Sequence, residues 1–203
     1  MSQRSMLNAS ANRSFLAVAS ASALIAFGAC RPAHDDGDRT EGAPVAPAFS
    51  LSDLGSTWHD QSAASRTLGS LRGHPQVLAL VYTNCTSICP MTVAVMQAAE
   101  AKAAPSIGFV LVSMDPARDS PTRLAEYAKQ HGLSPRWTLL SGDEKDVREL
   151  AAVLGIKYRK VSPTEIVHTS TLTILDADGR IIAQYSETDA VDRAIATLQR
   201  IAR

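Results

Sequence analysis

The chain has 203 residues, of which 20 are Lys or Arg and 20 are Asp or Glu, so its formal net charge at pH 7 is zero. Because the sequence has no basic patch and no long run of like charges, we expect no binding to nucleic acid. Its length fits one folded domain with one hydrophobic core, preceded by an N-terminal leader.

Residues 1–29 have the pattern of a signal peptide. Arg4 and Arg13 are followed by a charge-free apolar stretch, which is shorter than the ~20 apolar residues that a membrane span needs. Small residues then lead to Cys30, as at a bacterial lipoprotein processing site, although Phe27 stands where a branched aliphatic residue is usual. We therefore expect export, with Cys30 lipidated as the first mature residue. Ordinary signal-peptidase cleavage and an uncleaved N-terminal anchor are the alternatives.

Residues 30–47 are rich in Pro, Gly, Asp and Ala, a composition typical of a flexible tether. A lipid on Cys30 would then hold the folded part, residues 48–203, on the periplasmic side of the cytoplasmic membrane. The predicted organisation is a signal peptide, a lipid-anchored tether and one folded domain.

The first half of the folded part alternates between strand and helix patterns. Weak alternation over 49–60, with Gly55 inside it, predicts a short hairpin. The continuous apolar runs 76–82 and 107–114 have strand length and predict strands buried on both faces. Between them, residues 91–104 are rich in Ala and Met and stop at a proline, so they predict a helix.

Two further helices and a strand follow. Ser120-Pro121 is a favourable helix start and Gly132 a favourable end, so a helix is predicted between them. Residues 137–140 predict a short third strand. The segment 141–144 (Ser-Gly-Asp-Glu) has the pattern of a capping box, which predicts a helix that ends at Gly155.

The C-terminal part predicts an antiparallel pair and a last helix. Strands 171–175 and 181–185 are joined by the turn 176–179, and apolar residues at helical spacing predict a helix over 189–202. Strands that alternate with helices imply parallel crossovers. The sequence therefore predicts an α/β, thioredoxin-like fold: a central mixed sheet flanked by helices, with an N-terminal hairpin and an inserted helix.

Cys85 and Cys89 are the only cysteines of the folded part, and they lie between strand 76–82 and helix 91–104. At such a turn, backbone N–H groups and the positive end of the helix favour thiolate over thiol. Thiolates attack disulfides and bind soft metals, so the pair indicates redox or metal chemistry. A structural disulfide explains the pair poorly, because closing so small a loop constrains the unfolded chain little.

A histidine occupies the loop that should face these cysteines. In a thioredoxin-like fold this is the loop before the final antiparallel pair, here residues 166–170, and thioredoxins place a proline in it. This chain has His168 there. An imidazole facing two thiolates gives three ligands that suit copper, or zinc as second choice. Without this argument from the fold, a lone histidine before a strand is usually an ordinary surface residue.

Four ordered motifs are spaced as in a known family. They are Tyr82-Thr83-x-Cys85-x-x-x-Cys89-Pro90, the segment 112–119, Leu124-x-x-Tyr127, and 167–170 with the following Asp178-Gly179. Together they resemble the Sco/SenC family of copper-binding thioredoxin-like proteins. The resemblance implies one copper ion held by Cys85, Cys89 and His168, and delivery of copper to the binuclear copper centre of cytochrome c oxidase. It implies as partners the oxidase subunit with this centre, an upstream copper donor and a thiol reductant.

Several nearby residues have competing interpretations. Val167 stands where family members commonly carry an Asp that can orient the imidazole. Asp115 and Asp119 match acids near the family's copper site, but loop hydrogen bonding and helix capping are equally good roles for them. Met91 and Met96 carry thioethers that suit copper. Their helical positions in an Ala-rich segment nevertheless favour core packing.

Two classes of function stay open. A metallochaperone uses both thiolates and His168, whereas a thiol–disulfide oxidoreductase that reduces the acceptor's cysteines needs only Cys85 and Cys89. The histidine favours the metallochaperone, because disulfide exchange needs no ligand at that position. A peroxide-reducing enzyme is a weaker third hypothesis, based on Tyr82-Thr83-x-Cys85. The sequence predicts no further role for Tyr82, and it leaves open whether the protein is an enzyme.

Overall fold

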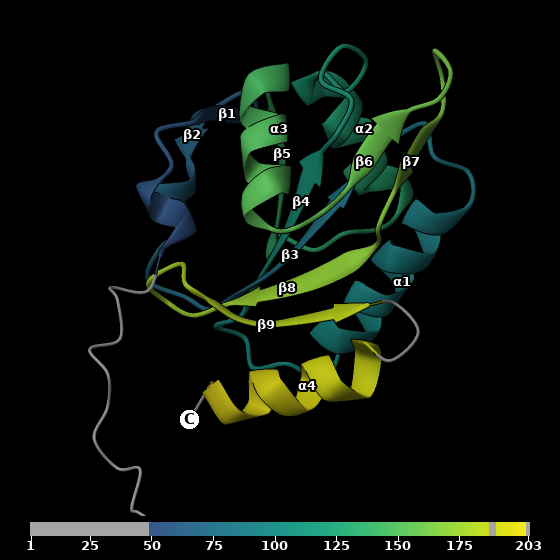
Figure 1. Ribbon diagram of the computed structural model, residues 1–203. Coiled ribbons are helices and arrows are strands. Elements are labelled where there is room, and N and C mark those ends of the chain that lie inside the picture. The colour runs from purple at the N-terminus through teal and green to yellow at the C-terminus, as the bar shows by residue number, and fades with distance from the viewer. Residues whose placement is uncertain (1–48, 187–189, 202–203) are drawn as a thin grey trace, which may run out of the picture. The chain divides into compact units, whose positions relative to one another are not determined.

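The computed structural model describes residues 49–186 and 190–201 (Figure 1). The strands are β1 (Thr57–Asp60), β2 (Ser65–Thr67), β3 (Gln76–Val81), β4 (Gly108–Ser113), β5 (Trp137–Gly142), β6 (Tyr158–Lys160), β7 (Ile166–His168), β8 (Thr171–Leu175) and β9 (Ile181–Ser186). The helices are α1 (Ile88–Glu100), α2 (Pro121–Gln130), α3 (Glu144–Val153) and α4 (Ala190–Ile201). The predicted signal peptide, Cys30 and most of the tether lie outside the described residues.

Seven strands form one mixed sheet in the order β2-β1-β5-β4-β3-β8-β9. The central strands β3, β4 and β5 are parallel, whereas β8 is antiparallel to β3 and β9 is antiparallel to β8. This confirms the predicted thioredoxin-like fold with its central mixed sheet.

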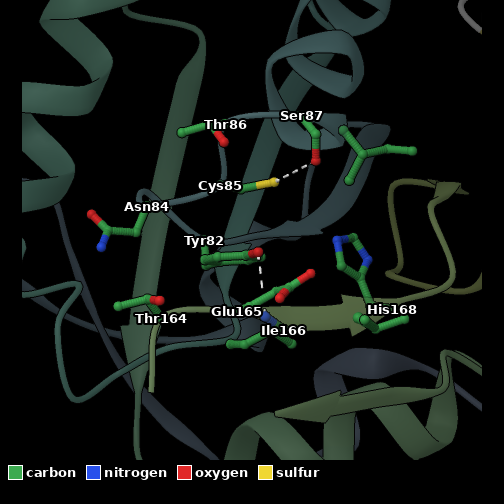
Figure 2. A pocket seen from close by; sticks show the side chains of 11 residues that line it. Tyr82, Asn84, Cys85, Thr86, Ser87, Thr164, Glu165, Ile166 and His168 are labelled. Carbon is green, nitrogen blue, oxygen red and sulfur yellow. Dashed lines mark hydrogen bonds between the residues drawn. The ribbon is translucent and has the colours of Figure 1, made fainter. Parts of the chain in front are cut away.

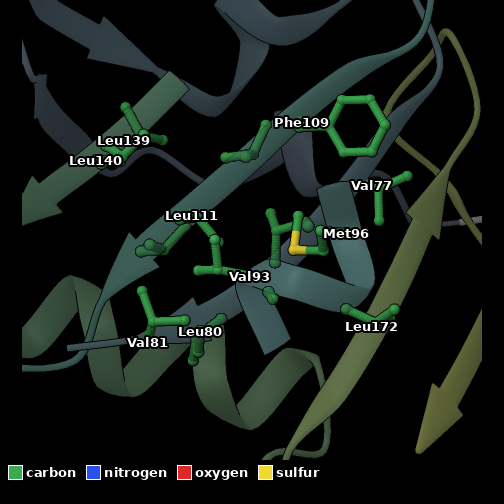
Figure 3. Packing of buried hydrophobic residues seen from close by; sticks show 14 of the residues in the cluster. Val77, Leu80, Val81, Val93, Met96, Phe109, Leu111, Leu139, Leu140 and Leu172 are labelled. Carbon is green, nitrogen blue, oxygen red and sulfur yellow. The ribbon is translucent and has the colours of Figure 1, made fainter. Parts of the chain in front are cut away.

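The core packs on both faces of β3, all of whose residues are buried. Figure 3 shows Val93 and Met96 of α1 among residues of β3, β4 and β8. Cys89, Val93 and Met96 follow at helical spacing and are each fully buried, so the face that packs the helix also carries the second cysteine. Helix α4 packs on β8 and β9 and against α1 (Figure 1).

Two of the predicted helix starts differ from the structure. Helix α1 begins at Ile88 rather than at residue 91, which places Cys89 in its first turn. The predicted capping box at 141–144 is wrong: β5 continues to Gly142, and the N-cap of α3 is Asp143, without a side-chain capping bond. The predicted start of α2 is confirmed, because Ser120 accepts a hydrogen bond from the N–H of Arg123.

The N-terminal hairpin exists, but not within residues 49–60. It consists of β1 and β2, which pair antiparallel from Thr57 to Thr67. The turn forms there because the carboxylate of Asp60 accepts hydrogen bonds from the N–H groups of Ser62 and Ala64. The positive φ of 65° at Ala63 completes this turn.

A second hairpin, which the sequence did not predict, is formed by β6 and β7. The predicted loop 166–170 is wrong for its first three residues, because they form β7 and pair antiparallel with β6, with Tyr158 opposite His168. Strand β6 reads Tyr-Arg-Lys and is largely exposed, so it lacks the apolar alternation that predicts a strand. In residues 49–186 and 190–201, no helix is long and apolar enough to cross a lipid bilayer.

Candidate metal centre

A pocket of about 520 Å³ opens where β3 ends. One side is the turn from Tyr82 to Ile88, which carries Cys85, and the other is the segment 164–168, which ends with His168 (Figure 2). The imidazole of His168 extends from β7 into the space beside the cysteine turn. The structure therefore brings a strand-to-helix turn and a distant hairpin together around one cavity.

The two thiols and the imidazole lie close together. The N–H of Cys89 donates a hydrogen bond to Sγ of Cys85 over 3.3 Å, because Cys89 sits in the first turn of α1, where N–H groups lack partners within the helix. Sγ of Cys89 lies 4.0 Å from Nε2 of His168. Both cysteines are buried thiols, not a disulfide. The predicted meeting of Cys85, Cys89 and His168 is thus present in the structure, while their role as ligands stays a prediction.

The surroundings of Cys85 favour its ionised form. Burial raises the pKa of this thiol, but hydrogen bonds from the thiol and N–H of Cys89 oppose that effect. Further hydrogen bonds from the N–H of Ser87 and the hydroxyl of Tyr82 bring the pKa to about 7. The pKa of the Cys85 thiol is thus lowered toward neutral pH, which favours the thiolate, the form that binds soft metals and attacks disulfides.

His168 presents Nε2 to the cysteines. Its Nδ1 lies 3.2 Å from the carbonyl oxygen of Thr169. A carbonyl only accepts, so Nδ1 carries a proton, and in the neutral imidazole the lone pair of Nε2 faces Cys89. The backbone of Thr169 thereby orients the imidazole, the role that an acidic residue at position 167 can take. Val167 itself is 55% exposed.

Sγ of Cys89 and Nε2 of His168 lie 4.0 Å apart, a separation that one metal ion bound to both atoms can span. In the described part of the chain, no three His, Cys, Asp or Glu residues are already gathered tightly enough to hold an ion.

Asp119 braces the segment that leads to Cys85. Its fully buried carboxylate accepts hydrogen bonds from the N–H of Thr83 (3.0 Å), from the hydroxyl of Thr83 (2.6 Å) and from the hydroxyl of Ser113 (2.5 Å). It thus ties the ends of β3 and β4 together two residues before Cys85. Of the two predicted roles for Asp119, the structure shows internal hydrogen bonding.

Asp115 forms ion pairs on the side of the pocket that carries His168. Its buried carboxylate forms ion pairs with Arg118 and, over 3.6 Å, with Lys160 of β6. It therefore connects the loop after β4 to the hairpin that carries His168. Neither Asp115 nor Asp119 lines the pocket of Cys85 and His168.

The two methionines have different environments. Met96 is fully buried, as predicted for core packing, but Met91 is 61% exposed and the prediction that it packs in the core is wrong. Residue 91 lies two positions beyond Cys89, which rotates its side chain away from the buried face of α1.

Tyr82 is a residue of the site that the sequence analysis missed. Its hydroxyl accepts a hydrogen bond from the N–H of Ile166 over 3.3 Å (Figure 2), and its ring meets the ring of His168 edge-on, with centroids 6.4 Å apart. Burial raises the pKa of Tyr82, so the hydroxyl keeps its proton and can donate to Cys85. The only local signal was its position three residues before Cys85.

Comparisons with known proteins identify the family and support the fold. The SCO1/SenC family model matches residues 38–203. A SCO1 protein homologue of Bacillus subtilis is 26% identical over 64% of this chain and 71% of its own. A SCO2-like protein of Rickettsia typhi is 27% identical over 62% of this chain and 66% of its own. The structure of Bradyrhizobium japonicum ScoI with copper bound superposes with a TM-score of 0.60 and 25% identity, over 72% of this chain and 96% of that one. The chain belongs to the SCO1/SenC family.

Proposed function

We propose that this protein is a copper metallochaperone that delivers one copper ion to the binuclear copper centre of cytochrome c oxidase. The observation that carries the proposal is the approach of Nε2 of His168 to within 4.0 Å of Sγ of Cys89, beside Cys85. Two sulfur donors and one imidazole suit copper, and their soft character disfavours magnesium or calcium. ScoI of Bradyrhizobium japonicum, a structural relative, holds copper.

The open pocket supports transfer rather than permanent storage. Cys85 and His168 line a cavity that reaches the surface, so an incoming thiolate of an acceptor can approach the metal and replace the ligands one at a time. The partners of this proposal are the oxidase subunit that carries the copper centre, an upstream copper donor and a thiol reductant. The reductant keeps Cys85 and Cys89 as thiols, the form that binds the metal.

We also propose that the protein is exported and anchored through a lipid on Cys30. A tether over residues 30–47 would raise the effective concentration of the donor beside a membrane-embedded acceptor. Intact mass of the membrane-extracted protein should show the loss of residues 1–29 and the gain of acyl chains. A soluble form that begins at another residue would contradict the anchor and leave export alone.

A thiol–disulfide oxidoreductase is the second candidate function. The pKa of about 7 for Cys85 supports it, because a thiol whose pKa lies near ambient pH exchanges disulfides fastest. In this role the protein reduces the acceptor's cysteines before they receive copper. His168 contributes no ligand to that reaction, so this residue separates the two candidates.

A strain that carries His168→Ala as its only copy tests the proposal. If copper delivery is the function, the oxidase should lack its binuclear copper signal, and added copper should partly restore it. The exposed His59 provides a matched control, and His59→Ala should assemble the oxidase normally. The reductase is identified instead if the His168→Ala strain assembles normal oxidase. In that case only the cysteine variants should be defective, and a small thiol should rescue them.

A further inference from the structure

Tyr82 stands between the two halves of the site. Its side chain is 5% exposed, and its carbonyl oxygen accepts a hydrogen bond from the N–H of Cys85 over 3.2 Å. Its hydroxyl accepts from the N–H of Ile166, two residues before His168, and its ring meets the imidazole edge-on at 75°. Tyr82 therefore contacts the cysteine turn through its backbone and through its hydroxyl, which donates to Cys85. The same hydroxyl reaches the histidine strand through the hydrogen bond to Ile166 that Figure 2 shows.

The β6–β7 hairpin depends on such contacts because it is not part of the seven-stranded sheet. The ion pair of Lys160 with Asp115 is one contact that joins the hairpin to the rest of the domain, but the Lys160 side chain is 52% exposed. The Asp115 carboxylate is buried, but water reaches the Lys160 ammonium and weakens the attraction between the two charges. The bond between Tyr82 and Ile166 is buried, so losing it leaves the Ile166 N–H without an acceptor and without water.

The edge of β7 explains why Ile166 is available. Ile166 and His168 lie on the same edge of the strand, because backbone groups alternate in direction along it. The N–H of Ile166 points away from β6 toward Tyr82. A shift of Ile166 relative to Tyr82 is therefore passed over two residues to His168, whose Nε2 has to come within bonding distance of a metal shared with Cys89.

We propose that Tyr82 is a positioning residue: its hydroxyl holds β7 through the N–H of Ile166 and so sets the distance between the His168 imidazole and the two thiols. The inference deepens the proposed function, since the geometry that it controls is that of the copper site. Without the hydroxyl, the ring still packs, but the hairpin loses the buried hydrogen bond that holds the backbone of β7 to the end of β3.

Tyr82→Phe tests the proposal, because it removes the hydroxyl and keeps the ring. Tyr158→Phe is the matched control: Tyr158 lies on β6 opposite His168, and its hydroxyl has no hydrogen bond within the described residues. In the copper-free protein we expect hydrogen exchange at the Ile166 amide to accelerate about tenfold in Tyr82→Phe and to stay unchanged in Tyr158→Phe.

Copper binding gives the second readout. Tyr82→Phe should weaken Cu(II) binding about tenfold and shift the sulfur-to-copper charge-transfer band, while both thiols still titrate and Tm changes by only a few degrees. A general loss of stability would not move the band at full copper occupancy. Because the Tyr82 hydroxyl also donates to Cys85, a change in copper affinity or in the band supports the proposal only when Ile166 exchange is faster as well. Unchanged Ile166 exchange in Tyr82→Phe would overturn the proposal.

The two readouts separate this inference from the proposed function. If the wild-type protein fails to bind copper, the metallochaperone proposal falls, while the Ile166 exchange still decides whether Tyr82 holds the hairpin. If Tyr82→Phe fails to fold, the wild-type protein decides: a slow Ile166 amide and a ring-to-ring nuclear Overhauser contact between Tyr82 and His168 support the role. An Ile166 amide that exchanges as fast as an exposed one overturns it.

Discussion

Cys85→Ser and Cys89→Ser should each abolish the gain in thermal stability that copper gives the reduced protein. Copper that binds only the folded state stabilises it by about 2.7 kcal/mol at a hundredfold excess over Kd. For a domain of this size each kcal/mol raises Tm by roughly 2–4 °C, so wild-type protein should gain about 5–11 °C. Differential scanning fluorimetry with and without copper, under reducing and oxygen-free conditions, measures this gain within each variant.

Met91→Leu is the control for this experiment. Met91 is a soft donor close to the site in sequence, but its side chain is 61% exposed and turned away from the buried face that holds Cys89. The Met91→Leu variant should therefore keep the full copper-dependent rise in Tm. If either serine variant keeps that rise, the two cysteines do not share the metal.

Asp119→Asn should strongly destabilise the protein even without copper. The carboxylate is fully buried and accepts three hydrogen bonds from Thr83 and Ser113. An amide of the same shape has one accepting oxygen, so its NH₂ group faces at least one donor and leaves that donor unsatisfied. Hydrogen bonds to charged groups contribute about 1.5–3 kcal/mol each, and we expect a loss of about 2–4 kcal/mol in the free energy of unfolding.

Urea unfolding of the copper-free protein measures this loss. Asp143→Asn is the control, because Asp143 is exposed at the N-cap of α3 and makes no side-chain capping bond there. Its unfolding free energy should change by no more than about 0.5 kcal/mol. If Asp119→Asn is equally harmless, the network between β3 and β4 does not hold the turn that carries Cys85.

The sequence predicted the parts of the site that depend on local order. The apolar run of β3 and the helix after it place Cys85 and Cys89 at a strand-to-helix turn, whatever the details of the rest of the chain. The thioredoxin-like order of elements then predicts that the segment before β8 faces this turn. The structure brings His168 there, 79 residues away in sequence from Cys89.

What the sequence could not predict depends on contacts between distant residues. Strand β6 has no apolar alternation and is defined by its pairing with β7. The bond from Ile166 to Tyr82 spans 84 residues. The role of Asp119 is a similar case. Its neighbours in sequence do not show whether its carboxylate caps the next helix or accepts hydrogen bonds from Thr83, which is 36 residues away.

The sequence patterns also predicted the wrong first residues for two helices, because tertiary contacts override the local signal there. The Ser-Gly-Asp-Glu segment fits a capping box, but Ser141 is held in β5 opposite His59 of β1. Strand pairing therefore continues past the residue that the local pattern chooses as N-cap, and Asp143 takes that place. In α1, burial of Cys89 with Val93 and Met96 starts the helix before the proline at position 90.

X-ray absorption at the copper edge of the reduced, copper-loaded protein tests the central claim most directly. We expect one copper per protein with two sulfur neighbours and one imidazole nitrogen, and loss of the imidazole signal in His168→Ala with both sulfurs retained. A wild-type spectrum with fewer than two sulfur neighbours, or one that His168→Ala leaves unchanged, would contradict a site built from Cys85, Cys89 and His168.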